Sequence, residues 1–440
     1  MKQFFHYLSI LILCFSCQFE QPKQELMKVQ QDAKYLQDLP FLKISRDELY
    51  DKILGNLVGS AIGDAMGAPT EMWSRRQIQL EYGLVDSLDN MVRAPSPEGT
   101  WDYNLTAGGT TDDTRWKVLL GEFYLQNTNN FYIEAGNHDH DFAAFLVDQY
   151  SSEIEKLKTT DSFDPAPFEQ QMLRVSWLQE WAVVAKPYAE KDLELYINAL
   201  SRFYGGEMVC AGLLYAPLLG VYYPGAPERA YESAYRLAIF DLGYAKDITA
   251  LAAAMVAEAF SPEVSAKRME NVLRDIDPKN YFKSRLVGRI SYNLFREALN
   301  ITDQAKKVVD DSLKTAISAD TLLHLQREKA FELLAKKSQD YPFHAGEIHL
   351  INLTALLFSG FDFREALTFV VNYGRDNDTV AAVTGAILGT YHGYDKIPDD
   401  MKLPVLKTNK EKLGIDLEDL ANRITDQLIA SNVVQVVSEQ

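Results

Sequence analysis

Glycines recur every fourth residue in two segments near opposite ends of this 440-residue chain. They are Gly55, Gly59, Gly63 and Gly67, and then Gly385, Gly389 and Gly393. Four residues of an α-helix turn about 400°, so each series lines one helix face. Glycine costs about 1 kcal/mol relative to alanine inside a helix, so a close approach of another backbone must offset it. The flanking residues are too polar for a packing interface within lipid. The spacing therefore predicts two central, tightly packed helices that bring distant loops together.

The rest of the chain also has helical periodicity, and alternating strand patterns are scarce. The clearest helical segments are 116–124, 141–150, 230–239, 248–260, 348–358 and 379–392. Residues 301–339 have the pattern of exposed amphipathic helices. Ser45 and Glu48 fit a capping box, which indicates that a folded domain begins there. We therefore expect one large all-α domain over residues 45–440.

The first residues have the pattern of a bacterial export signal. Lys2 precedes a short apolar run, residues 4–15, which ends before Ser16 and Cys17. A small residue before a cysteine is typical of a lipoprotein cleavage site, which predicts a signal peptide over 1–16 and lipidation of Cys17. Residues 17–44 would then form a linker, and the protein would be anchored in the cell envelope, in the periplasm or on the outer surface. The alternative is a secreted protein with ordinary signal cleavage.

Charge and cysteine content exclude some classes of protein. The 62 acidic and 44 basic residues give a formal net charge of -18, which disfavours binding to nucleic acid. Cleavage and lipidation at Cys17 would leave Cys210 alone, so no internal disulfide framework is expected. No run after the signal is long and apolar enough for a transmembrane helix. We expect a monomer attached to a membrane only through its lipid.

Two acidic clusters each precede a helical segment. They are Thr111-Asp112-Asp113-Thr114 and Asp376-Asn377-Asp378-Thr379. Carboxylate and hydroxyl oxygens are the hard ligands that magnesium requires. Asp and Thr are also common helix caps, and acidic first turns complement the helix dipole. Each cluster alone is compatible with either interpretation.

A third motif, at residues 59–71, decides between these interpretations. It has the form Gly-x-x-x-Gly-Asp-Ala-x-Gly-x-Pro-x-Glu and ends at Glu71. Together with the two acidic clusters, in this order, it resembles the signature of ADP-ribosylglycohydrolases over about residues 45–400. The resemblance implies a single large orthogonal helical bundle with two Mg²⁺ ions in an acidic cleft. Pro69 is expected to end the preceding helix near Gly67 and to leave Glu71 on a loop.

The resemblance also implies roles for individual residues. The expected metal ligands are Thr111, Asp112, Asp113, Asp376, Asp378 and Thr379. Glu71 and Asp113 are the catalytic candidates. Asp64 and Gly374 are assigned to substrate binding, with Asp64 also a candidate for orienting the ligands.

The chain departs from the family around the expected substrate cleft. Val209 occupies the place of a central arginine, and no histidine lies between His140 and His324. The substrate class therefore stays open between ADP-ribosyl conjugates and other ribosyl or glycosyl compounds. The segment 138–141 has the pattern of a loop and helix cap. The roles of Asp247, His344 and Glu347 also stay open.

The predicted function is that of a magnesium-dependent hydrolase of an N- or O-glycosidic bond. Two alternatives remain at this level. One is a metal-containing binding protein without turnover, and the other is a surface-tethered assembly protein whose acidic motifs only cap helices.

Overall fold

The computed structural model describes residues 40–92, 104–127, 138–159, 165–310 and 316–437. The predicted signal peptide, Cys17 and most of the predicted linker lie outside these ranges. Residues 42–44, which the sequence places in the linker, form a strand that pairs with the strand at 434–436. The folded body thus begins slightly before Ser45, because Leu42 and Ile44 are buried in the core.

The described part of the chain is all-α, as expected. Its longer helices are α3 (Arg46–Gly67), α5 (Asp112–Gln126), α6 (His138–Thr159), α7 (Pro165–Ala189), α11 (Ala245–Ala259), α13 (Ile290–Lys306), α15 (Ala319–Ala335), α16 (Ala345–Ser359), α18 (Asn377–His392) and α20 (Leu417–Ala430). The shorter ones are α4 (Arg75–Glu81), α8 (Leu193–Leu200), α9 (Ala216–Val221), α10 (Pro227–Leu237), α12 (Ala266–Asp275), α17 (Phe363–Tyr373) and α19 (Asp399–Thr408).

Short elements join these helices. The 3₁₀ turns are η1 (Ala68–Thr70), η2 (Phe203–Gly206), η3 (Ala211–Leu214), η4 (Tyr281–Lys283) and η5 (Tyr394–Lys396), and η6 (Asn409–Leu413) is a π-turn. Strand β1 (Leu42–Ile44) runs parallel to β4 (Val434–Val436), and β2 (Met91–Val92) runs antiparallel to β3 (Asn104–Leu105). No helix within the described ranges is long and apolar enough to cross a membrane.

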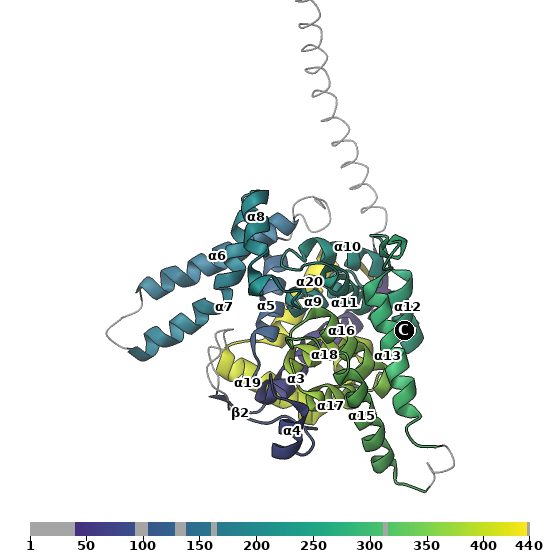
Figure 1. Ribbon diagram of the computed structural model, residues 1–440. Helices are drawn as coiled ribbons and strands as arrows, with labels where there is room; N and C mark the ends of the chain where they lie inside the picture. The colour runs from purple at the N-terminus through teal and green to yellow at the C-terminus, as the bar shows by residue number, and fades with distance from the viewer. Residues whose placement is uncertain (1–39, 93–103, 128–137, 160–164, 311–315, 438–440) are drawn as a thin grey trace, which may run out of the picture.

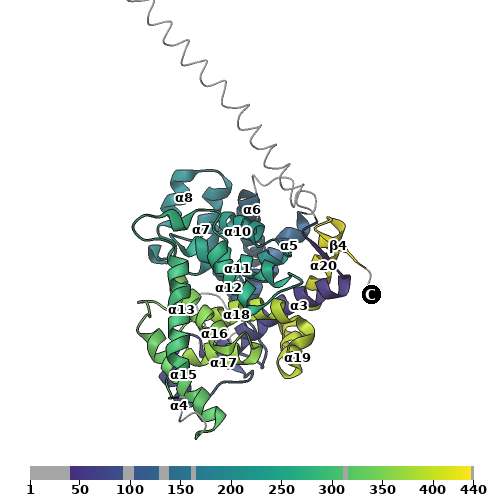
Figure 2. The same ribbon diagram turned by 90° about the vertical axis from the view of Figure 1, so that its right-hand side faces the viewer.

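Helices α3 and α18 pack against each other at the centre of the molecule (Figures 1 and 2). A Cβ added at Gly59 would overlap the carbonyl oxygen of Gly385, and one added at Gly55 would overlap that of Gly389. The predicted contact between the two glycine series is confirmed. Gly393 differs, since it ends α18 with a φ of 83° instead of packing inside it.

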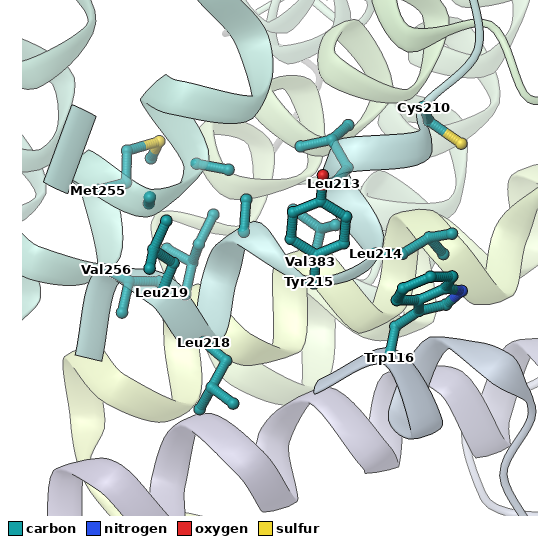
Figure 3. Packing of buried hydrophobic residues seen from close by; sticks show 14 of the residues in the cluster. Trp116, Cys210, Leu213, Leu214, Tyr215, Leu218, Leu219, Met255, Val256 and Val383 are labelled. Carbon is teal, nitrogen blue, oxygen red and sulfur yellow. The ribbon is translucent and has the colours of Figure 1, made fainter. Parts of the chain in front are cut away.

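The other helices surround this pair. Helices α6 and α7 form a hairpin that projects from one side of the body in Figure 1. Near the base of this hairpin, Trp116 of α5 packs beside Leu214 of η3, and Val383 of α18 belongs to the same apolar cluster (Figure 3). This core holds the start of α5 beside the start of α18, which is one of the two central helices. Those two helix starts carry the acidic clusters.

Candidate metal centre

One pocket gathers polar residues from three distant parts of the chain. Its polar lining residues are Glu71, Asp112, Asp113, Asp376, Asp378 and Thr379. The pocket encloses about 60 Å³, which is room for a few water molecules or ions. The structure therefore brings together both catalytic candidates and five of the six predicted ligands.

Packing between α3 and α18 explains why Glu71 lies in this pocket. A Cβ added at Gly67 would overlap the backbone of Asp378, so the end of α3 lies directly against the start of α18. Helix α3 ends at Gly67, as Pro69 predicts, and η1 follows. The Asn377 amide donates to the Thr70 hydroxyl at 2.9 Å. These contacts hold the loop that carries Glu71 beside the second acidic cluster.

A second connection joins the two loops through their backbones. Met72 N–H donates to the carbonyl oxygen of Arg375 at 2.7 Å, and Arg375 N–H donates to that of Trp73 at 2.9 Å. Gly374, assigned to substrate binding from the sequence, packs against Trp73 with a φ of 83° and is absent from the pocket lining. Its role here is therefore conformational, since a side chain would overlap the neighbouring loop.

Asp64, predicted to bind substrate or to orient the ligands, does not line the pocket. Its carboxylate is fully buried and accepts hydrogen bonds from Thr111 N–H (2.9 Å), Thr114 N–H (3.0 Å) and the Thr114 hydroxyl (2.6 Å). These bonds tie α3 to the first turn of α5, where Asp112 and Asp113 lie. Asp64 therefore orients the first acidic cluster instead of contacting a substrate. Thr111, the sixth predicted ligand, is buried at this junction and does not line the pocket.

The residue at the N-cap of each acidic cluster does not cap its helix with its side chain. The N-cap residues Thr111 and Asp376 make no side-chain capping hydrogen bond. Elsewhere in the described chain, capping side chains do accept such bonds from the first turn, at Ser45, Ser74, Asp192, Ser265, Ser318, Asp362 and Asp416. Helix capping therefore does not explain the two clusters.

Burial of these carboxylates has an electrostatic cost that Lys117 only partly offsets. Burial raises the pKa of Asp113 well above its ordinary value; nearby Lys117 opposes this shift, and the Asp378 carboxylate adds to it. The Thr379 hydroxyl donates to Asp113 Oδ2 at 3.0 Å. Asp113 Oδ1 has no hydrogen-bond partner among the described residues, and Lys117 Nζ lies 3.7 Å from it. A divalent ion would offset the cost of burying this charge, so the residues fit a metal.

The carboxylates line a common pocket but do not form a complete set of metal ligands. Among the described residues, no three Asp, Glu, His or Cys side chains converge as a ready-made set of ligands. Magnesium prefers an octahedral site and usually keeps several of its waters. An open pocket lined by oxygen atoms is compatible with that preference.

The remaining lining residues are mostly apolar, and of these the sequence placed only Val209 at the cleft. They include Trp181, Tyr204, Val209, Cys210, Leu214 and Phe343. Their loops are joined by a hydrogen bond of 3.0 Å from Cys210 N–H to the Phe343 carbonyl oxygen. Val209, in the place of the family's arginine, thus does line the pocket.

Backbone strain also collects at this pocket. Met72 and Tyr204 line it with positive φ values of 63° and 44°, and Arg375, beside Asp376, has a φ of 69°. Residues other than glycine rarely adopt this conformation, and such strain clusters at functional sites. The sequence Tyr204-Gly205-Gly206 was the available signal for this turn.

Three residues whose roles the sequence left undecided make structural contacts: Asp247, His344 and Glu347. His344 is the N-cap of α16, where Nδ1 accepts from Gly346 N–H at 3.0 Å. Glu347 forms an ion pair with Arg375 at 2.7 Å. Asp247 forms a fully buried ion pair with Arg289 at 2.6 Å. None of these side chains lines the pocket.

The chain is similar in sequence to two proteins without a characterised function. A protein of Archaeoglobus fulgidus with no characterised function is 26% identical over 343 residues, which cover 77% of this chain and 87% of that protein. The uncharacterised YegU of Escherichia coli K12 is 33% identical over 76 residues, 17% of this chain and 22% of that one.

The fold itself is similar to that of a solved structure described as an ADP-ribosylglycohydrolase-related protein complex. The TM-score is 0.52 at 18% identity, with 87% of this chain and 99% of that chain covered. The family model for ADP-ribosylglycohydrolases matches residues 45–432. The chain therefore belongs to the ADP-ribosylglycohydrolase family.

Proposed function

We propose that this protein is a hydrolase that uses two Mg²⁺ ions to cleave an N- or O-glycosidic bond of an ADP-ribosyl conjugate or a related ribosyl or glycosyl compound. The observation that carries the proposal is that five carboxylates, from three segments of the chain, line one small pocket. In both acidic clusters the N-cap side chain makes no capping hydrogen bond to its own helix. Family membership supports a glycohydrolase, and the pocket chemistry supports a metal-dependent one.

The metal would be held between the two helix starts. Asp112 and Asp113 would bind from the α5 side, and Asp376, Asp378 and Thr379 from the α18 side. Bound magnesium supplies a grip on vicinal sugar hydroxyls and a lowered pKa for a bound water. Asp64 holds the α5 side in place through its hydrogen bonds to Thr111 and Thr114.

Glu71 is the candidate general base. It lies on the loop between η1 and α4, is part-exposed, and lines the same pocket as the carboxylates. Cleavage of a glycosidic bond passes through an oxocarbenium-like state, which water attacks at the anomeric carbon. Glu71 would take the proton of that water as the new C–O bond forms. The hydrogen bonds of Met72 and Arg375 keep the Glu71 loop in place for this step.

The test is hydrolysis of a panel of ADP-ribosyl conjugates, nucleosides and glycosylamines, measured with Mg²⁺ and again with a chelator. We expect at least one compound to be cleaved only with the metal. The inactive control is Asp378→Ala, and the matched control is Asp399→Ala, an exposed acidic residue in the first turn of α19. Binding of panel compounds without turnover would instead favour a binding protein of the same fold. Turnover that is unaffected by the chelator would contradict the metal mechanism.

A separate proposal concerns location. We propose that Cys17 is lipidated and anchors the protein in the bacterial cell envelope. The support is the short apolar run that ends at Ser16 and Cys17. One acyl chain alone gives only reversible membrane binding, so more than one chain is needed for stable anchoring.

A further inference from the structure

The connection between α12 and α13, two helices on the right of Figure 1, displays apolar side chains to solvent. Six consecutive residues, 282–287, are exposed. The exposed fractions are 43% for Phe282, 93% for Leu286 and 57% for Val287, and Leu286 is the most exposed large apolar residue of the described chain. Single exposed apolar residues are common on protein surfaces, so this group becomes informative only through its surroundings.

Hydrogen bonds hold this segment, residues 279–288, in a defined shape, and we call it the apolar loop. The Asp277 carboxylate accepts from Tyr281 N–H at 2.8 Å and from Phe282 N–H at 3.0 Å. At the other end, Gly288 N–H donates to the Ser284 carbonyl oxygen at 3.0 Å. The apolar loop therefore needs little further ordering when its side chains meet a partner.

The charge around the apolar loop is opposite in sign to that of the whole chain. Residues 278–296 contain five lysines and arginines and no aspartate or glutamate, in a protein with a net charge of -18. Three of these cations, Lys279, Lys283 and Arg285, are exposed on the loop itself. Within the described ranges, Lys283 and Arg285 make no ion pair. Cations beside exposed apolar side chains suit a surface that meets the headgroups of an anionic bilayer.

Another group of exposed apolar residues has the opposite charge pattern. Helix α8 exposes Leu193, Leu195 and Ile197. Asp192 and Glu194 lie among them, and an anionic surface would repel these carboxylates. Exposure is therefore shared by both groups, whereas the combination with cations distinguishes the apolar loop.

The N-terminal part of the chain enters the folded body beside the base of the apolar loop. Phe41, near the start of the described residues, and Ile276, just before the loop, line the same cavity of about 400 Å³. Twenty-three residues, 18–40, separate Cys17 from Phe41. An extended chain covers about 3.3–3.6 Å per residue, so these residues span at most about 80 Å. That reach allows a lipid on Cys17 and the apolar loop to contact the same bilayer.

The acidity of the whole protein does not prevent this contact. Charges farther than about 8 Å from a bilayer are largely screened at physiological ionic strength. The charges within that distance decide the sign of the interaction, and those of the apolar loop are positive.

We propose that residues 279–288 form a membrane-contact loop for a bilayer that contains anionic phospholipid. Phe282, Leu286 and Val287 would enter the headgroup region, and Lys283 and Arg285 would pair with lipid phosphates. The proposal builds on the lipidation of Cys17 proposed above: the acyl groups would retain the protein at the bilayer, and the loop would fix which face of the body is turned towards it.

The first test measures the apolar loop without the lipid anchor. The chain from residue 17 onward, with Cys17→Ser, is sedimented with vesicles of phosphatidylglycerol and phosphatidylcholine in equal parts, and with vesicles of phosphatidylcholine alone. Each cation near an anionic surface corresponds to about a fivefold change in affinity. We expect at least tenfold tighter binding to the anionic vesicles at about 0.1 M salt, and loss of this difference at about 1 M salt. Equal binding to both vesicles, or binding to neither, would overturn the proposal.

The second test changes the loop in the same chain. Leu286→Asp should weaken binding to the anionic vesicles by tenfold or more, and Lys283→Gln combined with Arg285→Gln should weaken it by about 25-fold. The matched control is Leu193→Asp, on α8 and 69% exposed, which should bind as the unchanged loop does. Binding by Leu286→Asp equal to that of the control would refute the role of the loop. A dimer in the absence of vesicles that Leu286→Asp abolishes would assign the loop to an interface between copies of the chain, and would also overturn the proposal.

The third test locates the loop in the acylated protein. Leu286→Cys is labelled with an environment-sensitive fluorophore, because Cys210 is buried and an acylated Cys17 does not react. In anionic vesicles that contain spin-labelled lipid, we expect quenching of the label at Leu286→Cys and none at the control Leu193→Cys. Equal fluorescence at both positions would overturn the loop contact and leave lipidation standing. If Cys17 carries no lipid, the anchor is wrong, and the first two tests still decide whether the loop binds membranes.

Discussion

The contact between α3 and α18 predicts that replacing a glycine at the interface with alanine destabilises the protein. If the glycines were not in close contact with the other backbone, the same change would stabilise it. In an ordinary helix, a change from glycine to alanine stabilises by about 1 kcal/mol. At Gly63, however, the new Cβ would overlap the carbonyl oxygen of Ala381 and lie 2.7 Å from Ala382 N. An ordinary contact begins near 3.4 Å, so the contact with Ala382 N alone requires the two backbones to separate by roughly 0.7 Å, and the closer Ala381 oxygen requires more. Backbone atoms have no rotamer to change, so they cannot avoid this overlap.

The cost of this overlap exceeds the gain in helix propensity. Overpacking of a close-packed core costs about 1–3 kcal/mol, and a clash between backbone atoms belongs in the upper part of that range, about 2–3 kcal/mol. We therefore expect Gly63→Ala to lose about 1–2 kcal/mol after the propensity gain of about 1 kcal/mol. The same displacement would move Asp378 away from Asp113 and weaken Mg²⁺ binding. Urea unfolding measures the first effect and calorimetric titration of the metal measures the second.

A second helix-interior glycine provides the control. At Gly121 of α5, a new Cβ would meet only side-chain atoms, the nearest being Leu420 Cδ1 at 3.1 Å. Gly121→Ala should therefore be neutral or stabilising and should bind Mg²⁺ normally. If Gly63→Ala is as stable as wild type, the glycine series does not mark an obligatory backbone contact and the reasoning from its spacing is wrong.

Four further predictions concern catalysis, metal, pH and location. Glu71→Gln should lower turnover by about 10²–10⁴-fold, the usual value of a general base, with Mg²⁺ affinity near wild type; full turnover would remove Glu71 from the mechanism. Asp378→Ala should abolish binding of at least one Mg²⁺ ion and the rise in melting temperature that the metal gives the wild type; a preserved rise would contradict its role as a ligand. Burial lowers the pKa of His349 to about 4. Because the pKa is depressed in the folded state, the free energy of unfolding is highest above about pH 6.5 and falls by about 3 kcal/mol as the pH drops towards 4. His349→Leu should reduce this pH dependence in urea-unfolding measurements. Cys17→Ser should move the protein from the membrane to the soluble fraction; unchanged fractionation without detectable lipid label would refute lipidation.

The structural role of His349 is separate from the pocket. It is buried on α16, and its electrostatic environment is set by the Asp247–Arg289 ion pair. Tyr231 also donates to Asp247 at 2.5 Å in this network. A neutral imidazole is tolerated beside a paired aspartate and arginine, whereas a buried imidazolium would be an additional uncompensated charge. Acid destabilisation is therefore expected to arise here without any change in the metal ligands.

Local patterns in the sequence determined the helical class and the contact at the centre. Glycine spacing is a property of a single helix, so the face that meets a partner can be recognised without the partner. The motif order then indicated that the starts of α5 and α18 meet at the end of α3. Pro69 predicted the break that leaves Glu71 on a loop, because proline restricts the residue before it.

Tertiary structure alone decided which polar residues face the pocket. Asp64 and Asp113 are both buried aspartates close to one helix start, yet one accepts hydrogen bonds from the backbone of α5 and the other lines the pocket. His344 and Glu347 have a spacing compatible with a site, yet one caps α16 and the other pairs with Arg375. The direction of a polar side chain depends on partners that are distant in sequence, so spacing could not assign these roles.

The aromatic side of the pocket was also decided only by the fold. Trp181, Tyr204 and Phe343 come from three segments with no shared motif, and each alone has the pattern of an ordinary core residue. They meet because α7, η2 and the loop before α16 converge beside the acidic clusters. The metal ligands lie in short contiguous motifs at helix starts, which local sequence can reveal. The aromatic lining of the pocket is assembled from single residues far apart in the chain, and only packing brings them together.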